Sequence, residues 1–155
     1  MIEYKITKFN PQNYMGGKYI VNEWTSFSDV GKLFDDGVLT YNSYIHFEQC
    51  YINCCIELLQ KAGISKLLVV TPEYYAEGVH FPSTLSTEEE IREVIMCCLR
   101  EKFWAKLEGN NFFIHFGYDY HMYIGTNLSV AVVRETAKKH SLFCEEEESP
   151  YGLES

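Results

Sequence analysis

The segment from Trp104 to Gly125 constrains the fold of this chain more than any other stretch. Within it, aromatic and aliphatic residues alternate with more polar ones in short runs. Such alternation is typical of β-strands, because successive side chains point to opposite faces of a sheet. The runs are Phe103–Glu108, Phe112–Phe116 and His121–Gly125. Turn residues at Gly109–Asn111 and Gly117–Asp119 separate them, so the segment predicts three consecutive antiparallel strands.

The remainder of the chain predicts helices and further strands around these three. Apolar positions repeat every three or four residues over Tyr41–Ala62, which indicates a helix that Thr40 begins and Gly63 ends. Ser86, followed three residues later by Glu89, predicts a capping box at the start of a second helix. A short helix capped by Ser26 or Ser28 is expected to end at the Asp35-Asp36-Gly37 turn, and a last helix to run from Thr126 or Asn127 to Lys139. Further strands are expected at Tyr4–Phe9, Lys18–Val21, Lys66–Thr71 and Leu142–Glu146.

This order of elements predicts one α+β domain over residues 1–155. We expect a mostly antiparallel sheet of about five to seven strands, with the helices packed on one face. Residues 72–85, with two prolines and a glycine, are expected to form an ordered loop.

Charge limits the classes of partner. The chain has 22 acidic and 13 basic residues and a formal net charge of −9. Such a surface repels phosphates, so we expect no direct contact with nucleic acid. A basic partner is the natural complement, since opposite potentials speed encounter. The competing interpretation is that the acids only keep the protein in solution.

Targeting signals are not apparent in the sequence. No apolar run approaches the ~20 residues that cross a bilayer. The first fourteen residues lack the apolar core and cleavage site of a signal peptide. We therefore expect a cytoplasmic protein without a membrane partner.

The cysteines do not form a metal-binding pattern. None belongs to a Cys-x-x-Cys pair, and most lie in apolar helical stretches, where a free thiol behaves as a small hydrophobe. They are Cys50, Cys54, Cys55, Cys97, Cys98 and Cys144. We expect reduced thiols, no metal and no cofactor.

Catalytic motifs are equally scarce. The sequence has no Gly-x-Ser-x-Gly elbow, no phosphate-binding loop and no dinucleotide fingerprint. Two histidines and a carboxylate, His115, His121 and Asp119, could form a metal or general-base site, although their spacing matches no metal motif and surface histidines are the simpler interpretation. The predicted function is therefore not enzymatic, with a small metal- or ligand-dependent enzyme centred on these three residues as the alternative.

Aromatic and acidic residues near predicted turns are candidates for a protein interface. Tyrosine offers a large contact area at low entropic cost and is enriched at binding hot spots. The same tyrosines could also be ordinary half-buried residues. The candidates are Asp35, Asp36, Glu73, Tyr74, Tyr75, Glu77, Tyr118, Asp119, Tyr120, His121, Tyr123, Glu145, Glu146 and Glu147.

Several motifs resemble those of a group of small bacterial immunity proteins. The resemblance spans about residues 20 to 151, a single-domain length. The motifs are Asn22–Ser26, Asp29–Lys32, Leu39-Thr40, Leu107–Gly109, His115–Tyr120, Met122–Gly125, Leu142-Phe143 and Glu148–Tyr151. Proteins of this group are encoded beside polymorphic or contact-dependent growth inhibition toxins, and each neutralises its cognate toxin domain.

The resemblance implies a function for the acidic surface. Many such toxins are basic nucleases, so we expect this protein to bind a basic toxin domain, an RNase, and to occlude its active site or nucleic-acid groove. Charge complementarity would speed association and aromatic anchors would slow dissociation. We expect a monomer before the toxin binds.

Overall fold

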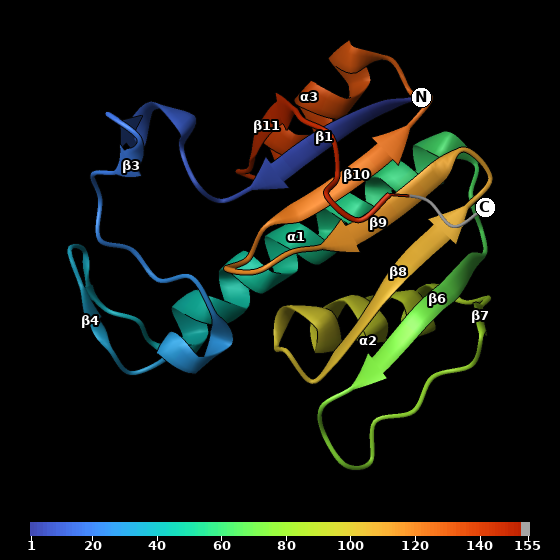
Figure 1. Cartoon of the computed structure of the whole chain (residues 1–155), viewed down its shortest axis with the longest axis horizontal. Helices are drawn as coiled ribbons and strands as arrows, with labels where there is room; N and C mark the ends of the chain where they lie inside the picture. Colours follow the sequence, from blue (N-terminus) through green and yellow to red (C-terminus); the bar gives the residue numbers. More distant parts are fainter. Residues whose placement is uncertain (153–155) are drawn as a thin grey trace.

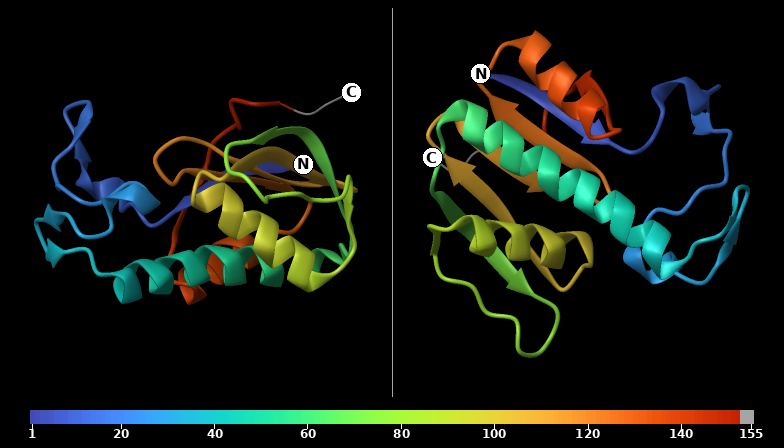
Figure 2. Two further views of the ribbon diagram at one scale, coloured as in Figure 1. Left: turned by 90° about the horizontal axis from the view of Figure 1, so that it is seen from below. Right: turned by 180° about the vertical axis from the view of Figure 1, so that it is seen from behind.

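The protein, described by a computed structural model of residues 1–152, is a seven-stranded antiparallel sheet with three α-helices on one face (Figure 1, Figure 2). The helices are α1 (Tyr41–Ala62), α2 (Glu88–Leu99) and α3 (Val130–Lys139). The strands of the sheet are β1 (Ile2–Thr7), β6 (Leu67–Tyr74), β7 (Thr84–Leu85), β8 (Phe103–Gly109), β9 (Phe112–Phe116), β10 (Met122–Thr126) and β11 (Phe143–Glu146). The predicted α+β class and sheet are confirmed.

The three predicted strands form the centre of the sheet. The strand order is β11-β1-β10-β9-β8-β6-β7. Ile114 of β9 pairs with Leu107 on one side and Ile124 on the other, and Tyr4 of β1 pairs with Ile124. These four side chains are fully buried in one row across four strands. The alternating pattern of the sequence thus fixes which side of each strand faces the helices.

The helix layer is organised around α1, which lies between α2 and α3 in Figure 2. The Thr40 side chain accepts a hydrogen bond from the Ser43 amide, and Gly63 ends the helix with a φ of 70°. Both ends of α1 are as predicted. No helix within residues 1–152 is long and apolar enough to cross a bilayer.

The starts of the other two helices differ from the prediction by one to three residues. The capping box of α2 is formed by Thr87 and Glu90 rather than by Ser86 and Glu89. The N-cap of α3 is Ser129, because Thr126 is still part of β10 and pairs with Ile2 and Phe112. Strand pairing therefore delays the helix beyond the first residue able to cap it.

A buried ion pair fixes the corner between α2 and β8. Arg100, directly after α2, donates from Nε and Nη2 to the two carboxylate oxygens of Glu48 at 2.8 and 2.9 Å. Glu48 is 1% exposed, and the guanidinium lies 4.9 Å from the Phe27 ring centre. A two-pronged pair of this kind holds its partners in one geometry.

Residues 8–39 leave the sheet after β1 and form a separate lobe at one end of it, visible in Figure 1. The lobe contains two short hairpins and two single-turn 3₁₀-helices. These are β2 (Tyr14–Met15) with β3 (Lys18–Tyr19), β4 (Leu33–Phe34) with β5 (Gly37–Val38), Pro11–Asn13 and Phe27–Asp29.

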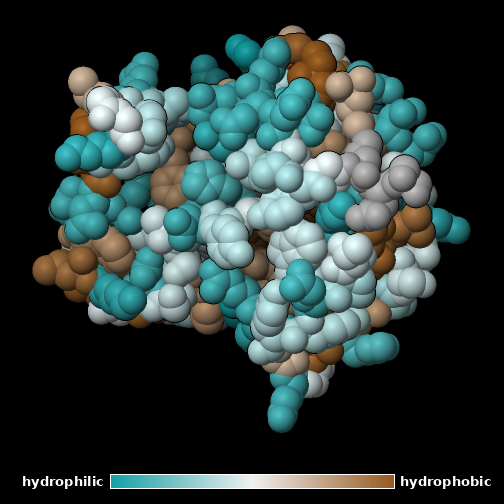
Figure 3. Space-filling model, in the orientation of Figure 1, coloured by the Kyte–Doolittle hydropathy of each residue, from teal (hydrophilic) through white to brown (hydrophobic). Residues whose placement is uncertain are grey.

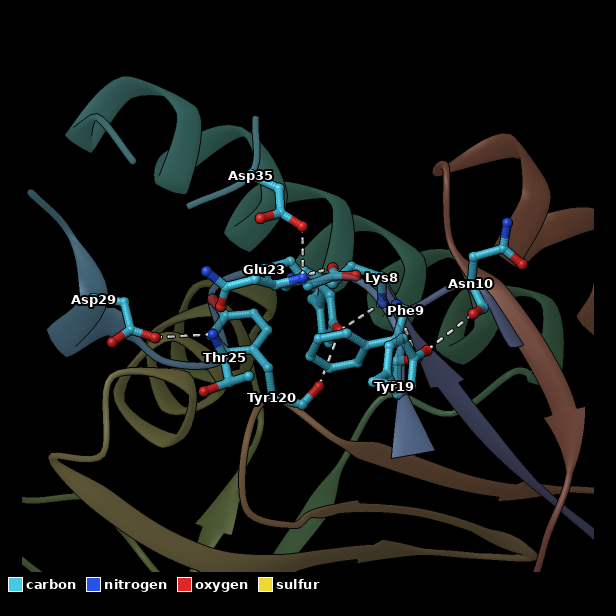
Figure 4. A network of polar contacts seen from close by, with 12 residues as sticks. Lys8, Phe9, Asn10, Tyr19, Glu23, Thr25, Asp29, Asp35 and Tyr120 are labelled. Carbon is cyan, nitrogen blue, oxygen red and sulfur yellow. Dashed lines mark hydrogen bonds and ion pairs between the residues drawn. The ribbon is translucent and has the colours of Figure 1, made fainter. Parts of the chain in front are cut away.

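Polar contacts hold this lobe against the helices (Figure 4). The amide of Lys8 donates to the Tyr51 hydroxyl at 2.8 Å, and the Lys8 ammonium pairs with Glu23 at 2.8 Å. That ammonium also lies 4.2 Å from the ring centre of Trp24. Tyr19 donates to the Asn10 carbonyl at 3.0 Å. The lobe is thus tied to α1 through buried groups.

Two predictions for irregular regions are wrong. The helix expected from Ser26 is only the 3₁₀ turn Phe27–Asp29, because the Asp29 carboxylate accepts from the Thr25 amide and Gly31 then takes a φ of 93°. Asp35 and Asp36 do form a turn, but it joins β4 to β5. The loop expected over 72–85 begins later, since β6 continues through Pro72 to Tyr74, and Thr84–Leu85 form β7.

Candidate protein-binding surface

The β9–β10 turn, Gly117–His121, lies at the same end of the sheet as the N-terminal lobe, the α2–β8 corner and the last residues of β6 (Figure 1). Hydrogen bonds close the turn, from the Gly117 amide to the His121 carbonyl at 2.8 Å and from the His121 amide to the Tyr118 carbonyl at 3.1 Å. Asp119 and Tyr120 have φ values of 56° and 64°. Two consecutive left-handed residues other than glycine are uncommon, so the surroundings must hold this turn.

Tyr120 anchors the turn in the core. Its hydroxyl donates to the Tyr44 hydroxyl at 2.7 Å, and its carbonyl accepts from the Tyr51 hydroxyl at 2.9 Å. Its ring lies 4.8 Å from the centre of the Trp24 ring, nearly perpendicular to it. Tyr120 is 5% exposed, so its prediction as an interface residue is wrong. Tyr118, two residues earlier, is 86% exposed.

The first hollow beside the turn, called the tryptophan hollow, has a volume of about 430 Å³. Aromatic side chains make up most of its lining, together with Glu73, Glu101, Cys98 and Gly117. The aromatic residues are Tyr75, Phe103, Trp104, Phe116, Tyr118 and Tyr151. The hollow therefore joins sequence candidates from two distant segments.

A bulge in β6 brings Glu73 into the tryptophan hollow. Leu68 pairs with Glu108 and Val70 with Lys106, so regular pairing would place Pro72 opposite Trp104. The register shifts after Val70, and Glu73 pairs with Trp104 instead. Since side chains alternate along a strand, the extra residue moves Glu73 to the face that Trp104 occupies.

The same bulge moves Tyr74 to the other face. Tyr74 pairs with Phe103, and their ring centres lie 5.0 Å apart. Its ring is also stacked with His80 at 6.4 Å. Tyr74 nevertheless remains 45% exposed.

The tryptophan hollow is acidic and internally ordered. Its lining includes Glu73 and Glu101 and no lysine or arginine. The Tyr75 hydroxyl donates to Glu73 at 2.7 Å, and this contact raises the pKa of Tyr75. Trp104 donates from its indole nitrogen to the Phe116 carbonyl at 2.8 Å, which fixes the ring. The charge of nearby Arg100 is already paired with Glu48.

A second hollow, called the N-terminal hollow, lies on the other side of the turn and has a volume of about 660 Å³. Its lining combines aromatic residues of the N-terminal lobe with acids of the turn and of the C-terminal region. Prominent among them are Phe9, Tyr14, Tyr19, Asp119, Glu145 and Glu147. His121 also lines it and packs against Phe9, with ring centres 5.4 Å apart.

Part of the charge in the N-terminal hollow is already compensated. Lys5 lies 3.7 Å from Glu145 and 3.2 Å from Glu147, and Glu23 is paired with Lys8. A larger share of the acids in this hollow is therefore paired with a basic residue than in the tryptophan hollow.

The other candidates lie outside the two hollows. Asp35 and Asp36 form the exposed tip of the β4–β5 hairpin, where Asp35 accepts from the Asn22 amide at 2.9 Å. Glu77 is exposed in the loop after β6. Glu146 faces the helix side of β11, 3.9 Å from Arg134. Tyr123 is half-buried on the open face of the sheet, the face away from the helices, opposite His115.

His115 is a core residue, not the surface histidine that the sequence favoured. It is fully buried on the open face, stacked on Phe113 with ring centres 4.0 Å apart. Its Nδ1 lies 2.7 Å from the Ser149 hydroxyl, in the C-terminal segment that crosses this face in Figure 1. Burial, followed by the charge of Lys106, lowers the pKa of His115 to about 4. The ring is therefore neutral at pH 7.

The hypothetical metal site is not assembled. Within residues 1–152, no group of three or more His, Cys, Asp or Glu side chains is arranged to hold a metal ion. The His121 ring points its Nδ1 at the Tyr118 carbonyl, 2.8 Å away, and not at His115. Cys50, Cys54, Cys55, Cys97 and Cys98 are buried free thiols and Cys144 is half-buried, and burial raises the pKa of each.

Seven of the ten residues that line the tryptophan hollow were not among the sequence candidates, and Glu101, Trp104 and Tyr151 are the most important of them. Glu101 lies just after α2 with a φ of 59°, Trp104 is the second residue of β8, and the ring centre of Tyr151 lies 5.3 Å from that of Trp104. The sequence held a partial signal for Trp104, because a large aromatic side chain on the more polar face of a strand is expected to pack against another residue or a ligand. No local pattern identified Glu101 or Tyr151.

The surface of the open face is predominantly polar at its centre (Figure 3). Figure 3 shows the open face in the view of Figure 1, with hydrophilic and intermediate shades across its centre and hydrophobic atoms toward its margins. Comparisons of the chain with protein-family models, with curated proteins and with solved structures gave no match.

Proposed function

We propose that this protein is an immunity protein that binds and neutralises a cognate, basic bacterial toxin domain without catalysing a reaction. The toxin in this proposal is an RNase, as the resemblance to immunity proteins implies, and the bound protein covers its active site or nucleic-acid groove. The contact surface is the β9–β10 turn with the two hollows beside it.

The observation that carries the proposal is the combination of exposed tyrosine and acid on one rigid turn. Tyr118 projects from the turn and is 86% exposed, while Asp119 beside it has no ion pair among the described residues. Tyr75 is 61% exposed across the tryptophan hollow. Large exposed aromatics on a surface rimmed by polar groups are typical of protein-binding sites.

The anchoring of the turn favours tight binding. Tyr120 holds the turn through its contacts with Tyr44 and Tyr51. A partner therefore does not have to order this loop, and ordering is one of the main costs of association. Rigid aromatic residues presented in this way give slow dissociation.

The charge distribution fits the same role. A net charge of −9 attracts a basic nuclease over long distances, which raises the association rate at low salt. At contact, the acids of the turn surface would occupy positions that the toxin uses for phosphates. Inhibition then requires no chemistry from this protein.

Co-expression with a toxin domain from a neighbouring gene, where the proposal places the cognate toxin, tests the proposal. Wild-type protein should restore growth and copurify with the toxin. The double variant Tyr118→Ala/Asp119→Asn should bind at least ~10-fold more weakly, because it removes one aromatic anchor and one charge. Asparagine tolerates the left-handed backbone at position 119, so the turn should keep its shape.

The matched control is Glu135→Gln, which neutralises an exposed acid on α3, on the opposite face of the sheet. It should leave binding and protection unchanged. Absence of both complex and protection for the wild type would rule out the proposed function.

A further inference from the structure

We propose that the tryptophan hollow binds the side chain of an arginine carried by a basic partner protein. This inference rests on the proposed function and gives the chemistry of the contact made at that surface. It assigns the position that the anchoring residue of the partner should occupy.

The walls of the hollow suit a flat cation. Trp104 and Tyr151 lie with ring centres 5.3 Å apart at an angle of 53°, and the exposed rings of Tyr75 and Tyr118 complete the rim. A guanidinium group stacks on aromatic faces and is attracted by their negative electrostatic potential, most strongly over tryptophan. The Trp104 ring is already held in place by its bond to the Phe116 carbonyl.

The carboxylates supply the charge that a cation requires. Glu73 and Glu101 both line the hollow, and neither forms a salt bridge within residues 1–152. Other acids of this region have a basic neighbour: Glu48 is paired with Arg100, and Glu145 lies 3.7 Å from Lys5. The hollow therefore holds two uncompensated negative charges beside an aromatic floor.

This combination discriminates among occupants. An anion would be repelled by Glu73 and Glu101, and an apolar side chain would leave their negative charges uncompensated. Lysine offers a compact, strongly hydrated charge, whereas arginine combines a stacking surface with a fork of donors that fits a carboxylate. Arginine is also enriched among the hot-spot residues of protein interfaces.

The hollow is shaped in advance for such a side chain. The β6 bulge brings Glu73 to the face of Trp104, and Tyr75 holds its carboxylate at 2.7 Å. Glu101 occupies a left-handed backbone position that the Arg100–Glu48 ion pair fixes from the adjacent residue. At about 430 Å³, the space lies within the range of about 300–1,000 Å³ that is usual for ligand sites.

Titration with a short peptide tests the inference on the full-length protein without any toxin. The probe is acetyl-Gly-Arg-Gly-amide, and the readout is the NMR signals of the two tryptophan indole groups. The Trp104 signal should shift in a saturable manner, while that of Trp24, which is 5% exposed in the core, should not. A Trp104→Phe variant assigns the two signals.

Control peptides separate the possible occupants. The same peptide with citrulline has the shape of arginine without its charge, and it should bind at least about tenfold more weakly. The lysine peptide should be weaker than the arginine peptide. If choline bound more strongly than the arginine peptide, the occupant would be a small quaternary ammonium ligand, and the assignment of an arginine side chain would be overturned.

Matched variants locate the site. Glu73→Gln and Glu101→Gln should each weaken binding of the arginine peptide about tenfold, because each removes a charged acceptor. Glu93→Gln, an exposed acid on the same helix that precedes Glu101, should have no effect. Thermal midpoints of all variants confirm that they are folded.

Two results would overturn the inference. One is the absence of a saturable Trp104 shift up to about 50 mM arginine peptide. The other is a shift confined to the amides of Asp119 and His121 in the N-terminal hollow. Toxin binding without the Trp104 shift would refute this inference alone, whereas a Trp104 shift without toxin binding or protection would refute the proposed function alone.

Discussion

Replacing Gly125 by alanine should be among the most damaging small substitutions in the sheet. Gly125 lies in β10 opposite Phe113 of β9, and the Phe113 ring covers it. A Cβ atom at position 125 would lie 2.1 Å from Phe113 Cε2 and within 2.7 Å of two further ring atoms. Distances this short require the ring to move.

The size of the effect follows from how little room the ring has. Phe113 is 1% exposed and stacked on the buried ring of His115, with centres 4.0 Å apart. Overpacking a filled core typically lowers the free energy of unfolding by about 1–3 kcal/mol. Because the Phe113 ring is buried and packed on His115, we expect a loss near the upper end of this range. For a chain of this length, a loss of about 3 kcal/mol lowers the thermal midpoint by about 6–12 °C.

Urea unfolding followed by circular dichroism measures this free energy, and Gly117→Ala is the matched control. Its added Cβ would meet atoms no closer than 3.4 Å, and the position has no left-handed backbone, so stability should change by less than about 1 kcal/mol. In a Phe113→Leu background, Gly125→Ala should cost much less, since the obstructing ring atoms are gone. A loss below about 1 kcal/mol for Gly125→Ala in the wild type would contradict the reasoning.

Individual side chains give three further predictions. Burial lowers the pKa of His115 from 6.5 to about 4, so the unfolded chain binds a proton at a higher pH than the folded protein does. The free energy of unfolding should therefore fall by about 3 kcal/mol as the pH drops from about 6.5 to 4. Unfolding of His115→Gln, measured at several pH values, should lack this decline. Glu101→Gly removes the strain of a non-glycine residue in the left-handed region, at φ 59°, and should raise the free energy of unfolding in urea by about 1 kcal/mol. The same variant should weaken binding of the arginine peptide. A loss of stability would contradict the assigned strain. Tyr120→Phe leaves the buried Tyr44 hydroxyl without its 2.7 Å partner and should cost about 1–3 kcal/mol, whereas adding Tyr44→Phe should recover part of the loss in a double-mutant cycle.

Elements governed by local signals were predictable from sequence. The long helix α1 has an apolar repeat over 22 residues, with Thr40 and Gly63 as its caps, and each signal acts within a few residues. The central strands are short apolar runs separated by turn residues, so their antiparallel order followed directly, and the spacing of Phe112, Ile114 and Phe116 gave the inward face of β9. The α+β class therefore follows from short-range patterns along the chain.

Side-chain direction at the binding surface was not predictable in the same way. Alternation treats Tyr118 and Tyr120 as equivalent, yet one is 86% exposed and the other 5% exposed. The difference arises from consecutive left-handed residues at Asp119 and Tyr120, which tertiary contacts with α1 stabilise. A local pattern contains no information about those contacts.

The acids of the tryptophan hollow show the same limit. Glu73 reaches the hollow through a one-residue bulge, which reverses the faces of β6 from that point onward. Glu101 reaches it from a helix end that the distant Glu48 fixes through Arg100. Charge and composition indicated a basic partner, but only the assembled sheet distinguishes the acids that converge on one hollow from those that lie elsewhere.

The most direct test of the central claim is amide hydrogen exchange of this protein with and without the cognate toxin domain. The proposed surface predicts slowed exchange in Gly117–His121 and Glu73–Tyr75, with little change in α1 and α3 on the opposite face. Protection confined to the helix layer would contradict the proposed surface. Uniform exchange in the presence of excess toxin would contradict toxin binding itself.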